Sequence, residues 1–118
     1  MSTRQTQEQE RAGQAWKNVR EDVKDKRFAS EYKALAVSAP ADVQTNGLGQ
    51  TLAFWLSKGK PEHNTLYNHV STWVVERVSA SGDLLLWITQ TDSVHYRQAT
   101  VEALAFLGWL RRFAQAEL

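Results

Sequence analysis

The sequence predicts an all-α fold: a compact single-domain bundle of about five to six helices around a long C-terminal helix. Three observations support this prediction. The last third, residues 92–118, contains no Pro and only one Gly, and its apolar residues recur at the helical period. Residues 7–25 show the same periodicity, and Gly or Pro divides the intervening chain into segments of helix length. At 118 residues the chain supports one hydrophobic core, so we expect a single domain, 1–118.

The C-terminal segment is the predicted centre of the bundle. About 23 residues of 92–118 fit one helix, whose Leu, Ala and Phe residues fill well over a third of its circumference. Because a helix this apolar must be surrounded, we expect the other segments to pack against it. One polar strip remains to face water or a partner. This strip consists of Arg97, Gln98, Arg112 and Gln115.

The first predicted helix spans about residues 7–25, after residues 1–6, which we expect to be frayed. Thr6 and Gln9 have the spacing of a capping box, and apolar residues recur from Ala12 to Val23 at spacings of 4, 3 and 4. At about 100° per residue, its charges separate into a basic side and an acidic side. The basic side is Lys17, Arg20, Lys24 and Arg27, and the acidic side is Glu10, Glu21, Asp22 and Asp25.

A second helix is predicted over residues 27–38. It should stop before Pro40, because the residue preceding a proline avoids the helical region. Residues 40–46 then form one or two separate turns, which begin at Pro40 and end at Gly47.

Three further helices precede the C-terminal one. Residues 48–58 predict a short, mostly buried helix that ends at Gly59, and Pro61 opens a helix that reaches about Ser79. Residues 84–88 are too short for periodicity to separate helix from strand, but helix is favoured because no partner strand is evident. Asp83 and Asp92 are the expected caps of the last two helices.

Composition excludes several classes of function. The chain has no Cys, which rules out disulfides, thiolate zinc sites and a cysteine nucleophile. Because no apolar run reaches about 18 residues and the N-terminus is polar, we expect a cytoplasmic protein. The net charge of +1 does not by itself indicate a nucleic-acid binder, so any such role depends on how the charges are placed.

The histidines give weak signals for chemistry. His63 and His69 are six residues apart and point to different faces of a helix, so we expect surface or helix-start histidines and neither metal nor cofactor. Asp92, His95 and Arg97 could act as acid, base and anion clamp. An acidic helix cap is the favoured interpretation, because the sequence indicates no pocket around them.

Residues 46–49 are Gly-rich but match no phosphate-binding fingerprint. A sharp turn between helices is the favoured role for them. Alternatively, the backbone amides of residues 47–50 lie at a helix N-terminus, which suits an anion.

The basic side of the first helix is the strongest functional signal in the residues themselves. Four cations at spacings of 3, 4 and 3 span about 15 Å, enough to follow several phosphates. The alternative is a solvated face balanced by the acidic side. Two further basic pairs share this ambiguity, and together the candidate phosphate contacts are Lys17, Arg20, Lys24, Arg27, Lys58, Lys60, Arg111 and Arg112.

Two long stretches carry a family resemblance. The first is Thr45-Asn46-Gly47-Leu48-Gly49-Gln50, followed by Leu52-Ala53-Phe54, Ser57-Lys58 and Leu66-Tyr67, and the second runs irregularly from Tyr96-Arg97 to Phe113-Ala114. Over about residues 28–116 the chain resembles the small-subunit family of the type III-B CRISPR effector, the RNA-guided complex that captures and destroys foreign RNA in antiviral defence.

The resemblance implies an all-helical subunit without catalytic activity. Copies in that family stack head to tail into a minor filament beside the backbone filament that carries the guide RNA. The minor filament lines a channel for target RNA and touches the large polymerase-like subunit at one end. RNA cleavage belongs to the backbone subunits.

Three hypotheses follow. In the first, the basic side contacts the sugar-phosphate backbone of target RNA without reading sequence. In the second, the chain is a purely structural spacer, and the acidic side of one copy meets the basic side of the next. The third is an enzyme, for which His95 is the candidate catalytic group.

Overall fold

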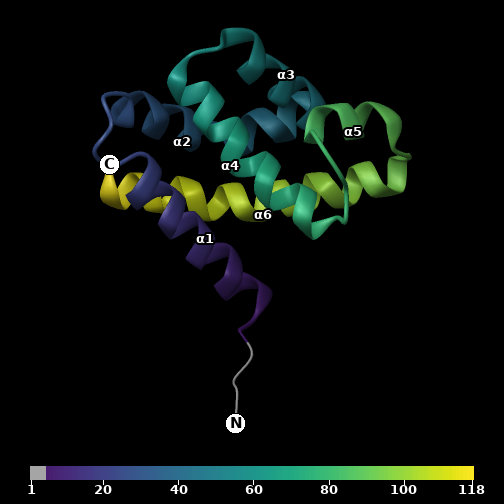
Figure 1. Cartoon of the computed structure of the whole chain (residues 1–118), viewed down its shortest axis with the longest axis horizontal. Helices are drawn as coiled ribbons and strands as arrows, with labels where there is room; N and C mark the ends of the chain where they lie inside the picture. The colour runs from purple at the N-terminus through teal and green to yellow at the C-terminus, as the bar shows by residue number, and fades with distance from the viewer. Residues whose placement is uncertain (1–4) are drawn as a thin grey trace.

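The computed structural model describes residues 5–118, which form six helices and no strand (Figure 1). The all-α prediction is therefore confirmed. Of the expected frayed segment 1–6, residues 1–4 lie outside the described residues, and Thr6 is already a helix cap. The helices are α1 (Gln7–Asp22), α2 (Ala29–Asn46), α3 (Leu48–Lys58), α4 (Pro61–Arg77), α5 (Leu84–Gln90) and α6 (Ser93–Glu117).

Helix α6 is the centre of the bundle, as predicted. Asp92 caps it by accepting a hydrogen bond from the His95 backbone N–H at 2.8 Å. Helices α1, α2 and α4 pack directly on it, whereas α3 packs mainly on α2, α4 and α5 (Figure 1). The predicted polar strip of α6 is exposed, and Val94 and Val101 extend it with apolar surface.

Helix α1 begins with the predicted capping box between Thr6 and Gln9, but it ends at Asp22 rather than near residue 25. The early end has a packing reason. Asp22 and Tyr32 of α2 both contact His69 of α4, so the chain must turn between them to bring α1 and α2 onto α4.

Helix α2 runs without interruption through Pro40, so the prediction of separate segments at 27–38 and 40–46 is wrong. A proline inside a helix costs about 3 kcal/mol or more. The buried face on both sides of it offsets that cost, because fully burying a side chain such as Val43 contributes about 1.5–3 kcal/mol. This face consists of Tyr32, Ala36, Ala39 and Val43.

Helix α3 starts after Gly47, whose φ of 86° suits glycine, and it ends at Gly59 as predicted. The expectation that it is mostly buried is wrong. Leu48, Leu52 and Trp55 are buried, but Ala53, Phe54 and Leu56 are exposed. Because α3 lies at the edge of the bundle, only one of its faces meets other helices.

Helix α4 begins at Pro61 as predicted. Residues 84–90 form a helix rather than a strand, capped by Asp83, whose carboxylate accepts from the Leu86 backbone N–H at 3.2 Å. Among the described helices, none is long and apolar enough to cross a membrane.

Candidate nucleic-acid interface

The eight candidate basic residues are all exposed, but they lie in different parts of the fold. Arg20 and Lys24 meet the C-terminal end of α6, where α1 runs beside it. The turn between α3 and α4 lies well apart from that place (Figure 1). Lys17 and Arg20 are in α1, Lys24 and Arg27 in the turn after it, Lys58 and Lys60 at the α3–α4 turn, and Arg111 and Arg112 in α6.

The predicted regular stripe on one helix is therefore wrong in part. Lys24 and Arg27 follow the end of α1, so the four cations do not share one helical spacing. The chain turn changes their directions, and the basic surface depends on contacts between α1 and α6 rather than on the periodicity of α1 alone.

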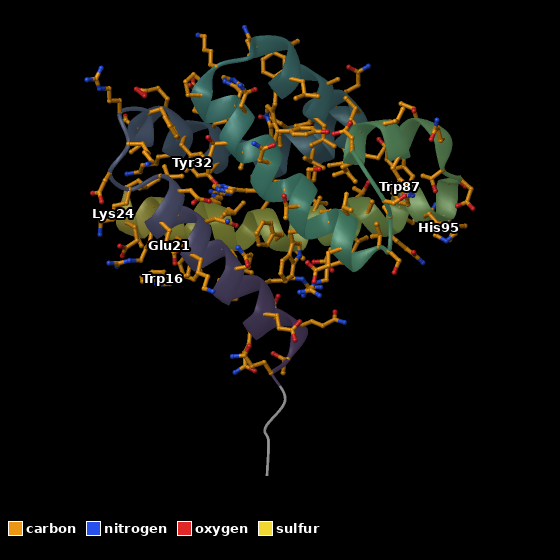
Figure 2. The ribbon with its side chains drawn as sticks, viewed as in Figure 1. Trp16, Glu21, Lys24, Tyr32, Trp87 and His95 are labelled. Carbon is orange, nitrogen blue, oxygen red and sulfur yellow. The ribbon has the colours of Figure 1, made fainter. Side chains whose placement is uncertain are left out.

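We call the contact between these helices the outer seam; it comprises Trp16, Arg20, Lys24, Phe113 and Glu117. Trp16 packs edge-on against Phe113 with ring centroids 5.1 Å apart, and the Arg20 guanidinium lies 5.1 Å from the centroid of the Trp16 ring. Arg20 and Lys24 both donate to Oε1 of Glu117, at 3.0 Å and 2.9 Å. Trp16 and Lys24 lie on the same side of the molecule in Figure 2.

Glu117 holds the two cations of the outer seam loosely. The hydrogen bond from Lys24, and then the charges of Lys24 and Arg20, lower the pKa of Glu117, so it is ionised at neutral pH. The side chains of Arg20 and Lys24 are 45% and 39% exposed. Ion pairs this open to water are weak, so phosphate oxygens could replace the carboxylate at little cost.

A second polar cluster joins α1 to α6 farther toward the N-terminus of α1. We call it the inner clamp; it comprises Arg11, Trp73 and Glu102. Arg11 donates twice to Glu102, at 2.6 Å and 3.0 Å, and the Trp73 indole N–H donates to the same carboxylate at 2.9 Å. The side chains of Arg11 and Glu102 are only 15% and 13% exposed. Burial by itself would raise the pKa of Glu102, but the bonds from Arg11 and Trp73 outweigh it and the pKa is lowered.

The other basic candidates are available to a partner. Within residues 5–118, no salt bridge engages the six candidates outside the outer seam. Because cations already exposed and unpaired lose little on meeting a phosphate, these residues are also suited to direct contact. They are Lys17, Arg27, Lys58, Lys60, Arg111 and Arg112.

We did not predict from the sequence that aromatic rings would lie beside three of the basic residues. Arg20 lies over Trp16, Lys58 over Phe54 and Arg77 over Trp73, at 5.1, 5.3 and 3.9 Å from the ring centroids. In each case the cation follows the aromatic residue by four positions on one helix. That spacing is visible in the sequence and could have indicated these pairs.

Asp92, the possible acid of the Asp92, His95 and Arg97 group, is a helix cap. Asp92 accepts from the backbone N–H of His95 and contacts its ring Nδ1 at 2.7 Å, and these bonds lower the pKa of Asp92. A shallow hollow of about 520 Å³ is lined by Asp92, Tyr96 and Arg97 among others, but His95 lies outside that lining. The arrangement matches a structural N-cap.

His69 is buried, so the expectation of a surface or helix-start histidine is wrong for this residue. Its Nδ1 accepts from the Tyr32 hydroxyl, and its Nε2–H donates to Asp22, both at 2.8 Å. Burial lowers the pKa of His69 despite the nearby Asp22 carboxylate, so the ring is held neutral between two partners. His63 does lie at the start of a helix, and no cluster that could hold a metal occurs in the described part of the chain.

Two of the backbone N–H groups considered for an anion already have partners. The Gly47 N–H donates to the Val43 carbonyl at 2.8 Å. The Gly49 N–H donates to the Tyr96 hydroxyl at 2.9 Å, and this bond fixes the start of α3 to α6. A turn with close packing, the favoured interpretation of residues 46–49, therefore describes the region correctly.

These features define a class: an all-helical bundle with a basic, aromatic-lined surface and a polar interior that joins its helices. The profile of the family described as "CRISPR-associated protein (Cas_Cmr5)" matches residues 7–117. The "CRISPR system Cmr subunit Cmr5" of Thermus thermophilus is 34% identical over 111 residues, which cover 94% of this chain and 95% of that protein. The crystal structure of a "CRISPR-associated Cmr5 family protein" from the same organism matches with a TM-score of 0.83, 30% identity and coverage of 97% and 99% of the two chains.

The chain therefore belongs to the Cmr5 family, the small-subunit family of type III-B CRISPR effectors that its sequence resembles. The similar crystal structure also confirms the bundle of helices around a long C-terminal helix.

Proposed function

We propose that this chain is the non-catalytic small subunit of a type III-B CRISPR effector complex in the cytoplasm. Copies of it, each acting as one domain, stack into a minor filament that contacts the backbone and large subunits and helps hold target RNA. Family membership supports the assembly. The observation that carries the RNA role is the outer seam, where Glu117 holds the exposed Arg20 and Lys24 weakly and Arg20 lies over the exposed Trp16.

The chemistry of the proposed contact is electrostatic. Lysine and arginine side chains neutralise phosphates and release counterions, and such contacts carry no sequence information. Each copy offers only a few cations beside its acidic residues, so a single copy binds weakly. Tethered copies along one RNA raise the effective concentration of every further contact, which makes the filament a much stronger binder than the free chain.

Charge reversal tests the RNA role. Lys17→Glu combined with Arg112→Glu changes two exposed, unpaired cations, one three residues before Arg20 in α1 and one next to Phe113 in α6. It should weaken target-RNA capture by the assembled complex, with a flatter salt dependence. Arg97→Glu is the matched control, because it changes an exposed arginine near the start of α6, far along the helix from the seam. Equal affinity of the reversed and wild-type complexes across several salt concentrations contradicts the RNA role.

A structural spacer is the second candidate, and exposed Glu21 and Asp25 beside the basic residues favour it. In that case the basic surface of one copy meets the acidic surface of the next. Charge swapping separates the two functions. If Lys17→Glu breaks assembly and adding Glu21→Lys restores it, the surface serves contact between subunits.

A further inference from the structure

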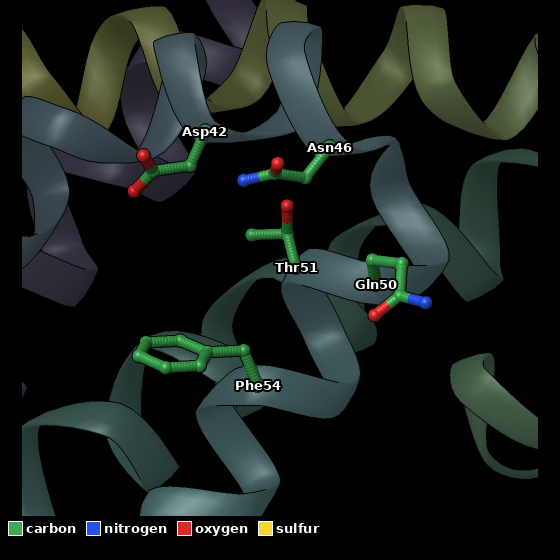
Figure 3. A pocket seen from close by; sticks show the side chains of 5 residues that line it. All are labelled: Asp42, Asn46, Gln50, Thr51 and Phe54. Carbon is green, nitrogen blue, oxygen red and sulfur yellow. The ribbon is translucent and has the colours of Figure 1, made fainter.

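A pocket of about 480 Å³ lies between α2 and α3 (Figure 3). Asp42 and Asn46 of α2 face Thr51 and Phe54 of α3 across it, and Gln50 stands at its edge. Its volume falls within the range of about 300–1,000 Å³ that is typical of small-ligand sites.

One wall of the pocket is aromatic. The Phe54 side chain is 51% exposed, so the core does not require it. The Lys58 ammonium lies over the ring, 5.3 Å from its centroid, and the His63 ring packs against it in a T-shaped arrangement with centroids 6.1 Å apart. An exposed ring with a cation beside it suits a planar base that stacks on the ring while its phosphate meets the cation.

The other wall is polar, and its two side-chain amides are unpaired. Within the described residues, the side-chain amides of Asn46 and Gln50 make no hydrogen bond, and the Asp42 carboxylate accepts only from the Ser38 hydroxyl at 3.1 Å. These groups can bind the edge of a heterocycle. The Asp42 carboxylate also repels a phosphate inside the pocket. We therefore expect the phosphate to lie outside the pocket, next to Lys58.

We propose that this pocket binds a single unpaired nucleobase of the target RNA, stacked on Phe54, with an adjacent phosphate at Lys58. The inference rests on the proposed RNA-holding function and adds a base-contacting site to it. Because the Asp42 carboxylate accepts N–H donors, adenine, cytosine and guanine, which carry amino groups, bind better than uracil, which brings carbonyl oxygens toward the carboxylate.

Photocrosslinking locates the base directly. Target RNA with 5-iodocytidine at one position at a time is irradiated in the assembled complex, and the subunit is digested with trypsin. A crosslink is expected in the tryptic peptide 34–58, which contains Phe54. Phe54→Ala should abolish it, Phe54→Tyr should retain it, and 5-iodouridine at the same position should lower its yield.

Affinity measurements supply a second readout. With a target whose pairing to the guide is shortened, so that affinity stays measurable, Phe54→Leu should weaken capture roughly 5- to 100-fold, because leucine cannot stack on a base. Leu56→Ala is the matched control, since Leu56 is 41% exposed on the same helix but does not line the pocket. This control should leave capture unchanged.

The failures of the two proposals are distinguishable. Crosslinks that map only to other peptides of this chain, or full affinity of Phe54→Leu, overturn the base pocket and leave RNA holding intact. A Phe54→Ala subunit that folds but fails to join the complex also overturns it, because the pocket then serves a protein contact. If no residue of this chain crosslinks and reversal of Lys17 and Arg112 has no effect, the RNA role itself is wrong.

Discussion

The inner clamp and the outer seam join α1 to α6 with the same kinds of residue, yet their surroundings differ. In each cluster, one or two basic side chains of α1 or of the turn after it pair with a glutamate of α6, and a tryptophan contacts one member of the pair. In the inner clamp the charged side chains are about 15% exposed or less, and in the outer seam the cations are 39% exposed or more. Burial makes the inner clamp a fixed structural contact. The exposed outer seam, in contrast, can exchange its ion pairs for contacts with a partner.

The two tryptophans provide the largest expected contrast. Trp73 is buried and stacks on Phe106 with ring centroids 5.0 Å apart, so Trp73→Ala should cost about 3–5 kcal/mol of unfolding free energy. Trp16 keeps much of its surface in water, so Trp16→Ala should cost about 1–2 kcal/mol. Urea unfolding followed by circular dichroism measures both, and equal losses would erase the distinction between the two clusters.

The two glutamates provide the next contrast. Glu102→Gln should lower the unfolding free energy by about 1–3 kcal/mol, because it leaves the poorly exposed Arg11 guanidinium with only the more exposed Glu8 carboxylate as a countercharge. Glu117→Gln removes an exposed pair and should leave stability within the error of the same urea experiment. A larger loss in the Glu117 variant than in the Glu102 variant contradicts the assignment of the two roles.

The Asp22–His69–Tyr32 cluster joins α1 to α2 and α4. We expect it to make a smaller contribution to the unfolding free energy, and this contribution should depend on pH. The folded state holds the pKa of His69 below its ordinary value of 6.5, so the unfolded chain takes up the proton first as pH falls. Stability should therefore decrease as pH falls from about 7 through the unfolded pKa, and level off below the folded pKa. His69→Gln should lack this component in urea titrations at a series of pH values; an unchanged pH dependence argues against a neutral, buried His69.

Local signals predicted most of the fold. The capping box at Thr6, the ends at Gly47 and Gly59 and the start at Pro61 all depend on nearby residues, and they were predicted correctly. The continuity of α2 through Pro40 was not, because it depends on burial against α6, which no local rule contains. The exposure of Phe54 was missed for the same reason, since only the packed structure shows that α3 lies at an edge.

The candidate site was less predictable. All eight cations are exposed, but the sequence could not show that Glu117 reaches Arg20 and Lys24 across more than 90 residues of chain. It also overstated the regularity of the basic side, because the turn after Asp22 depends on where His69 lies. Pairs such as Trp16 with Arg20 follow a local spacing and could have been found.

The most direct test of the account is the salt dependence of target-RNA capture by the assembled complex that carries Glu117→Gln. Glu117 pairs with two cations, Arg20 and Lys24, that a phosphate group can bind in its place. The substitution should therefore raise capture at low salt, by roughly two- to fivefold, and steepen the dependence of log affinity on log salt by about one unit. Glu102→Gln, introduced as the control, should change neither quantity in complexes that assemble. Identical affinity and slope for Glu117→Gln and wild type would contradict the claim that the outer seam exchanges its carboxylate for RNA.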